Sequence, residues 1–235
     1  MKKITTLLCI LLCMTLLLSA HTTNDSRTSS QESSQLTKLP PPQRDGSPFG
    51  VDVNINMTTI DNWLERPDVA YFDMRMLYDP ADFCAIRQPS DLVTTLPGFR
   101  IVPFPFLACL GPMPVGDAYD GDRLFTVVWG ANRGEILEIT PNFLESETIL
   151  NDIFPKDKAI FLMCGGAGYA ALARGLLIHL GWNENLIYHT GGNWFYNGNR
   201  GIDMTISSDN PGIATWRANY VFIDFENLNP IETDF

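Results

Sequence analysis

The clearest pattern in the chain is an apolar run that ends at a cysteine and continues into glycines. Residues 159–163 (AIFLM) are all apolar, which is typical of a short buried strand. Residues 169–180 (YAALARGLLIHL) form an apolar helical stretch, and Gly181 behind them is a common helix end. The pattern therefore predicts a strand and a helix that are joined by a glycine-rich turn.

Two further segments extend this prediction. Residues 185–189 (NLIYH) read as the next strand, so that a helix separates two strands in the order typical of an α/β protein with a mainly parallel sheet. Residues 216–225 alternate polar and aromatic side chains, which predicts a strand or an extended segment packed on the domain. We expect one α/β domain over residues 48–235.

Cys164 lies where the predicted strand meets the turn, and this position favours a reactive thiol. Glycines in such a turn let successive backbone N–H groups point inward, and the helix N-terminus adds partial positive charge. These donors favour the thiolate and can lower a cysteine pKa from about 8.5 to roughly 3.5–7.5. The alternative is that Cys164 is a small buried apolar residue at the end of a strand.

Three other motifs for this turn fail on spacing. A tyrosine-phosphatase-like loop needs an arginine where Ala170 stands, and a dinucleotide-binding turn needs an acidic residue about 20 positions further on. The strand over residues 185–189 is followed there by Thr190 instead. The glycines precede no Walker lysine, so the sequence gives no support to nucleoside-triphosphate binding.

Several segments in order resemble the rhodanese (sulfurtransferase) family, most strongly over residues 57–200. The resemblance rests on an early strand with an Asp73-x-Arg75 signature, a short helix behind it, a proline-rich return, the cysteine loop with its helix, and a closing strand with a glycine pair and a tryptophan. These segments are residues 68–75, 78–83, 97–103, 159–180, 181–188 and 191–194. The resemblance implies a rhodanese-like domain, here with an extra mid-domain segment (117–135) and a C-terminal extension (201–235).

The resemblance also implies a chemistry in which the loop cysteine carries sulfur. In this family the cysteine takes a sulfane sulfur from a donor, becomes a persulfide and passes the sulfur to cyanide or a thiol. It assigns Cys164 as the nucleophile, with no metal or cofactor, and a substrate-binding loop of residues Gly165, Gly166, Ala167, Gly168 and Tyr169. Members that use thiosulfate commonly carry a cation in this loop, which is uncharged here and closer to the loop of mercaptopyruvate sulfurtransferases.

Other polar residues are expected to be structural. Asp73 and Arg75 are expected to anchor neighbouring loops, and His179 and His189 to be packing or surface residues rather than metal ligands. Tyr169 is expected to pack at the helix start. The cationic candidates outside the loop, Arg123 and Arg133, are expected to be solvated surface arginines that could alternatively reach over the site.

The N-terminus predicts export. Lys2 and Lys3 precede an apolar run over residues 4–18, and small residues at 18–20 offer a cleavage site, so residues 1–20 read as a signal peptide. Residues 21–47 are polar and then proline-rich, which predicts a disordered linker. We expect an extracytoplasmic protein without membrane insertion after cleavage, with anchoring through the N-terminus as a minor alternative.

Cysteines and charge narrow the partners. The mature chain keeps Cys84, Cys109 and Cys164, so at least one thiol stays free even if Cys84 and Cys109 pair. A formal charge of −11 without a basic cluster argues against nucleic acid and anionic membranes as partners.

Two functional hypotheses follow. The first is an exported sulfurtransferase with a small sulfur donor and a thiol or cyanide acceptor, and the second is an inactive rhodanese-fold module that binds a protein. A thiol-disulfide factor is a third reading, but the chain has no Cys-x-x-Cys.

Overall fold

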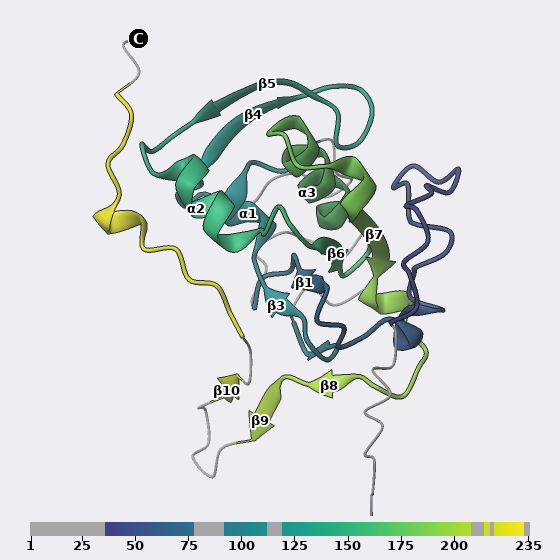
Figure 1. Cartoon of the computed structure of the whole chain (residues 1–235). Helices are drawn as coiled ribbons and strands as arrows, with labels where there is room; N and C mark the ends of the chain where they lie inside the picture. Colours follow the sequence, from purple (N-terminus) through teal and green to yellow (C-terminus); the bar gives the residue numbers. More distant parts are fainter. Residues whose placement is uncertain (1–35, 78–91, 112–118, 208–213, 217–218, 233–235) are drawn as a thin grey trace, which may run out of the picture. The chain divides into compact units, whose positions relative to one another are not determined.

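The computed structural model describes residues 36–77, 92–111, 119–207, 214–216 and 219–232 (Figure 1). One compact unit, Leu39–Phe235, contains the fold. The predicted signal peptide, linker residues 21–35, the predicted short helix at 78–83 and Cys84 lie outside the described residues.

A four-stranded parallel sheet forms the centre of this unit. Its order is β3 (Arg100–Ile101), β1 (Val69–Asp73), β6 (Ala159–Cys164) and β7 (Ile187–Gly192). The predicted strand at 159–163 is β6, and its burial at every position explains why its sequence is continuously apolar. The predicted strand at 185–189 begins two residues later as β7, because a 3-10 turn, η3 (Glu184–Leu186), precedes it. The expected α/β architecture with a parallel sheet flanked by helices is confirmed.

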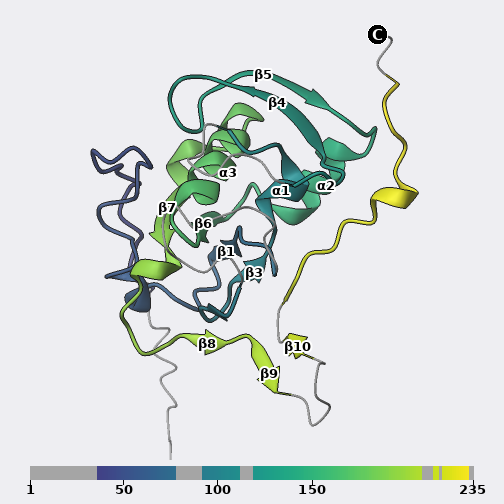
Figure 2. The same cartoon turned by 180° about the vertical axis from the view of Figure 1, so that it is seen from behind.

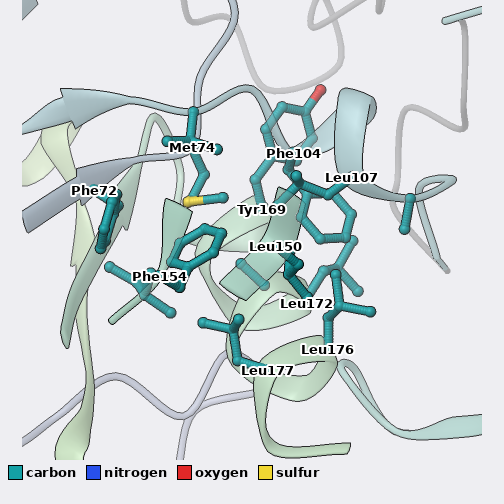
Figure 3. Close-up of a cluster of buried hydrophobic side chains, with 14 of the residues drawn as sticks. Phe72, Met74, Phe104, Leu107, Leu150, Phe154, Tyr169, Leu172, Leu176 and Leu177 are labelled. Atoms are coloured by element: carbon teal, nitrogen blue, oxygen red, sulfur yellow. The ribbon is translucent and has the colours of Figure 1, made fainter. Parts of the chain in front are cut away.

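Side chains alternate along β6 and feed two apolar layers. Ile160 and Leu162 join a cluster formed with α1 (Phe104–Leu107), α2 (Ser146–Ile153) and α3 (Gly168–His179), part of which Figure 3 shows. Phe161 and Met163 join a second cluster, which includes the 3-10 turn η1 (Ile60–Asn62) and the segment before it. Both faces of the sheet are therefore covered, and the predicted helix over 169–180 is α3, shifted by one residue.

Small antiparallel pairs surround the sheet. β4 (Phe125–Trp129) lies in the expected mid-domain segment (117–135) and pairs with β5 (Ile136–Pro141), which follows that segment; this hairpin runs over α3 in both views (Figures 1 and 2). The turn of the hairpin packs closely on α3, since a Cβ atom on Gly134 would lie 2.7 Å from the Ala171 carbonyl oxygen. Two shorter pairs join β2 (Thr94–Thr95) to β8 (Ile202–Asp203) and β9 (Thr205–Ser207) to β10 (Ala214–Trp216).

Within the segment 216–225, which is expected to be extended, residues 219–225 pack on the domain as expected. Ile101 of β3 hydrogen-bonds Asn219 and Val221 on both sides of Tyr220, at distances of 2.7 and 2.8 Å, so the tail continues the sheet edge. Phe225 begins the 3-10 turn η5 (Phe225–Asn227) and contacts the rings of Phe106 and Phe143.

The ordered domain begins earlier than residue 48. Leu39 packs against the second apolar cluster, and the carbonyl of Pro40 accepts a 2.7 Å hydrogen bond from the Tyr188 hydroxyl. Residues 39–47 thus belong to the compact unit rather than to the expected linker.

Among the described residues no helix has the length and apolar character that a membrane span requires.

Candidate functional site

Cys164 is the last residue of β6, at the carboxyl edge of the parallel sheet. It pairs with Gly192 of β7, while the residue before it, Met163, pairs with Asp73 of β1. The thiol is 2% exposed and belongs to the first apolar cluster. The topology therefore brings the ends of three strands together around one buried thiol.

The shape of the turn after Cys164 depends on Ala167 and on the packing of Trp194. Its left-handed residue is Ala167 with φ 77°, not one of the glycines at 165, 166 or 168. Gly165 and Gly166 are needed because the Trp194 ring lies against them: added Cβ atoms would be 2.7 and 2.5 Å from ring carbons. The absence of side chains at these two positions thus permits close packing of a tryptophan, a contact that the local sequence pattern does not predict.

Residues of β7 and the turn that follows it hold the loop from outside. The Trp194 N–H donates to the Gly165 carbonyl at 3.2 Å, and the ring nitrogen Nε2 of His189 lies 3.0 Å from the Ala167 carbonyl oxygen. Gly192 packs so closely that a Cβ atom there would lie 2.3 Å from the Gly165 oxygen. Two loop carbonyls are therefore bound by these residues.

The electrostatics of Cys164 correct the expected thiolate. Burial raises the pKa of Cys164 to about 11, and this effect outweighs the backbone hydrogen bonds from Ala170 and Tyr169, which lower it. The charge of Asp73 raises this pKa further, and that of Arg75 lowers it. The expectation of a pKa below the ordinary value was wrong because it counted the donors and not the desolvation of a buried anion. The resting site holds a neutral thiol that faces two N–H donors.

Asp73 and Arg75 form a buried ion pair beside this thiol. Arg75 donates from Nε to Oδ1 of Asp73 at 2.9 Å and from Nη2 to Oδ2 at 2.6 Å. Arg75 also donates to the Thr94 carbonyl, and the Thr95 hydroxyl donates to Asp73 at 3.0 Å. This anchoring of the segment around β2 agrees with the structural role expected from the sequence.

The other sequence candidates pack against aromatic rings. Tyr169 is 3% exposed with its ring 6.2 Å from that of Phe104, which agrees with the expected packing role. The guanidinium groups of Arg123 and Arg133 lie over the rings of Tyr119 and Phe49, so both half-buried arginines pack against aromatic residues instead of being fully solvated.

The two histidines differ. His179 is exposed on α3, whereas His189 is 1% exposed and contacts the cysteine loop. The sequence reading treated them alike, and no motif in the sequence distinguishes them. Within the described part of the chain no group of histidine, cysteine and acidic residues is arranged to hold a metal ion.

Cys109 offers a contrast to Cys164. It is a free thiol, half-buried, and its Sγ donates to the Val127 carbonyl at 3.2 Å. Cys109 carries a free thiol, so the structure shows no disulfide from it to Cys84, which lies outside the described residues.

Comparisons with models of protein families, with curated proteins and with solved structures give no match for this chain. The chemistry of the site is therefore argued from its own geometry.

Proposed function

We propose that the protein is an exported sulfurtransferase of rhodanese-like fold that carries sulfane sulfur on Cys164. The observation that carries this proposal is the position of Cys164 at the end of the central parallel strand, with the N–H groups of Tyr169 and Ala170 directed at its sulfur. Such fixed donors stabilise negative charge where it develops in a reaction, which is the usual source of electrostatic catalysis. The resting thiol can stay neutral if the anion forms only during the transfer.

The reaction balances without a cofactor. After a base in solution removes the thiol proton, the Cys164 sulfur attacks the outer sulfur of a donor R–S–S⁻. A new S–S bond forms on Cys164, the donor S–S bond breaks, and R–S⁻ leaves. An acceptor thiolate then attacks the outer sulfur of the Cys164 persulfide, which forms the acceptor persulfide and returns the Cys164 thiolate. The two N–H groups are placed to share the negative charge in both steps.

The arrangement of the segments supports the rhodanese-like interpretation. The segments that resemble the early strand, the return, the cysteine strand and the closing strand of that family are β1, β3, β6 and β7 here. They lie side by side in one parallel sheet. The glycine pair and the tryptophan of the resemblance, Gly191, Gly192 and Trp194, pack next to the cysteine loop or continue the strand that borders it.

The charges near the thiol favour donors with little negative charge. Arg75 is already bound to Asp73 and Thr94, and Asp73 places a carboxylate close enough to raise the Cys164 pKa. A dianion such as thiosulfate would be repelled by that carboxylate. We therefore favour a protein persulfide, an organic polysulfide that carries a single negative charge, or a mercaptopyruvate-like donor.

Intact mass of the mature protein after incubation with thiosulfate, 3-mercaptopyruvate or polysulfide tests the proposal. We expect an organic polysulfide with a single negative charge to add one reducible sulfur atom to the wild type and to Cys109→Ser, and none to Cys164→Ser. Cys109→Ser is the matched control because a hydroxyl can keep the bond to the Val127 carbonyl. Failure of every donor to add sulfur to a protein with a free Cys164 thiol would overturn the proposal.

The same experiment decides the second candidate, a rhodanese-fold module that binds a protein without turnover. The burial of the Cys164 thiol and its pKa of about 11 favour this candidate, since both slow the attack of the sulfur. A protein that remains folded and takes up no sulfur would leave the binding module as the better interpretation.

A further inference from the structure

His189 stands out among the buried polar residues because its position is energetically costly. The side chain is 1% exposed, and its Nδ1 atom has no hydrogen-bond partner among the described residues. Backbone groups of Gly50 and Phe49 lie near the ring but do not reach hydrogen-bond geometry with Nδ1. A buried nitrogen without a partner destabilises a fold, and an apolar side chain of similar size would avoid this cost. The one hydrogen bond that the His189 side chain makes within the described residues therefore calls for a function.

That bond joins His189 to the turn of the cysteine loop. Because the partner is the carbonyl oxygen of Ala167, Nε2 must carry the proton and Nδ1 must be the unprotonated nitrogen. Burial lowers the pKa of His189 to about 4, so the ring is neutral near pH 7. Neutral His189 is thus a fixed N–H donor to the loop.

Ala167 is the residue that turns the chain from β6 into α3. Its φ of 77° lies in the left-handed region, which is unfavourable for a residue with a Cβ atom and persists only where the surroundings hold it. The residues that follow, Tyr169 and Ala170, are those whose N–H groups reach the Cys164 sulfur. The Ala167 carbonyl accepts from the Ala171 N–H of α3 at 3.1 Å and from His189 at 3.0 Å, so His189 is the partner outside the helix that fixes the peptide before these donors.

The strand that carries His189 is irregular at this point. Leu162 of β6 pairs with His189, whereas the next residue, Met163, pairs with Gly191, so that Thr190 is an extra residue in β7. The Thr190 hydroxyl donates to the Leu162 carbonyl at 3.0 Å. Bulges of this kind redirect side chains and are frequent beside active sites.

We propose that His189 is a positioning residue for Cys164, whose Nε2–H group holds the Ala167 carbonyl and thereby keeps the loop N–H groups directed at the sulfur. The consequence for sulfur transfer rests on the proposed function. The effect on the thiol itself does not, because it follows from the loop geometry alone.

The test uses the mature protein carrying Cys84→Ser and Cys109→Ser, which leaves Cys164 as the only thiol. The rate at which iodoacetamide alkylates Cys164 is measured between pH 7 and 9.5 in three proteins. These are this parent protein, which keeps His189, and its His189→Gln and His189→Leu variants. The amide nitrogen of Gln can occupy the place of Nε2, whereas Leu has a similar volume and no donor. Near-ultraviolet circular dichroism establishes that each variant is folded.

We expect His189→Leu to react about tenfold more slowly at each pH, the factor that one unit of thiol pKa represents. His189→Gln is expected to stay within about twofold of the parent protein, since its amide can donate to the same carbonyl. A purely structural role predicts the opposite sign for Leu, because a loosened loop exposes the thiol and accelerates alkylation. Equal rates in all three proteins, or faster alkylation of His189→Leu, would overturn the proposal.

Two further measurements complete the design. If His189→Leu does not fold, His189→Asn replaces it, because the Asn amide is one bond too short to reach the Ala167 carbonyl. Slower alkylation of His189→Asn than of His189→Gln and the parent protein supports the proposal. Equal alkylation rates in these proteins overturn it. The initial rate of sulfur loading by polysulfide is then compared between the Leu and Gln variants. If the parent protein takes up no sulfur, the proposed function fails while the alkylation rates still decide the role of His189.

Discussion

At the scale of single residues, the site is dominated by the competition between burial and hydrogen bonding at Cys164. Two backbone N–H groups favour the anion, and the surrounding apolar cluster disfavours it. Burial prevails, because removing a unit charge from water costs several kcal/mol and two neutral donors return only part of this cost. The nearby ion pair also acts on the Cys164 pKa: the Asp73 carboxylate raises it and the Arg75 guanidinium lowers it.

The first prediction concerns the reactivity of the resting thiol. With a pKa of about 11, Cys164 should be alkylated at pH 7 about a hundredfold more slowly than a cysteine of ordinary pKa, because only the thiolate reacts. The measurement is the iodoacetamide rate in residues 21–235 with Cys84→Ser and Cys109→Ser, where Cys164 is the only thiol, in buffer and in denaturant. Similar rates in the two conditions would contradict the buried, neutral thiol.

The second prediction concerns Asp73. Asp73→Asn removes the charge that raises the Cys164 pKa, so alkylation near pH 8 should become faster. The same change leaves Arg75 buried without its partner, and we expect the free energy of unfolding to fall by about 3–5 kcal/mol.

Asp68→Asn is the matched control, because Asp68 also pairs with an arginine but its side chain is 46% exposed. We expect that change to cost less than about 1 kcal/mol in denaturant unfolding. Equal costs for the two substitutions would show that the buried pair has no special weight.

At the scale of elements, the sequence predicts best where one local pattern decides the structure. The buried strand β6 and the apolar helix α3 both appear in the sequence as apolar runs, and their predicted bounds agree with the structure to within a residue. The start of β7 is displaced because residues 184–186 form a 3-10 turn with Asn183 as its cap, which hydrophobicity alone does not indicate. The sequence predicts the glycine-rich turn between β6 and α3, but not the contact that needs its glycines, since Trp194 comes from a segment about 30 residues away.

The third prediction tests that contact. Gly166→Ala places a Cβ atom where the Trp194 ring now lies, at 2.5 Å from a ring carbon, so the ring must move. We expect a loss of about 1–3 kcal/mol in the free energy of unfolding and a change in tryptophan fluorescence. In the Trp194→Ala background the same change should be nearly neutral, because the clash is gone. Equal losses in the two backgrounds would contradict the packing of Trp194 on the loop.

At the scale of the whole molecule, distant segments complete the structure around the sheet. The tail pairs with β3 through Asn219 and Val221, and the segment before residue 55 reaches β7 through a 2.8 Å bond from the Asp52 N–H to the His189 carbonyl. These pairings link parts of the chain more than 100 residues apart, and local patterns contain no information about them. The backbone of His189 binds the N-terminal segment at Asp52, and its side chain binds the cysteine loop at Ala167. Protonation of His189 therefore affects the stability of the entire domain.

The last prediction follows from this position of His189. Its pKa is lowered from 6.5 to about 4, so between these values the unfolded chain binds a proton that the folded chain does not. Stability therefore falls as the pH falls from 6.5 to about 4, and this residue contributes up to about 3 kcal/mol to the loss. His189→Gln has no titrating ring and should lose that much less on going from pH 7 to pH 4 in denaturant unfolding. His179→Gln replaces an exposed histidine and should follow the wild type. If all three proteins lose stability equally on acidification, His189 is not the buried neutral donor on which the geometry of the cysteine loop depends.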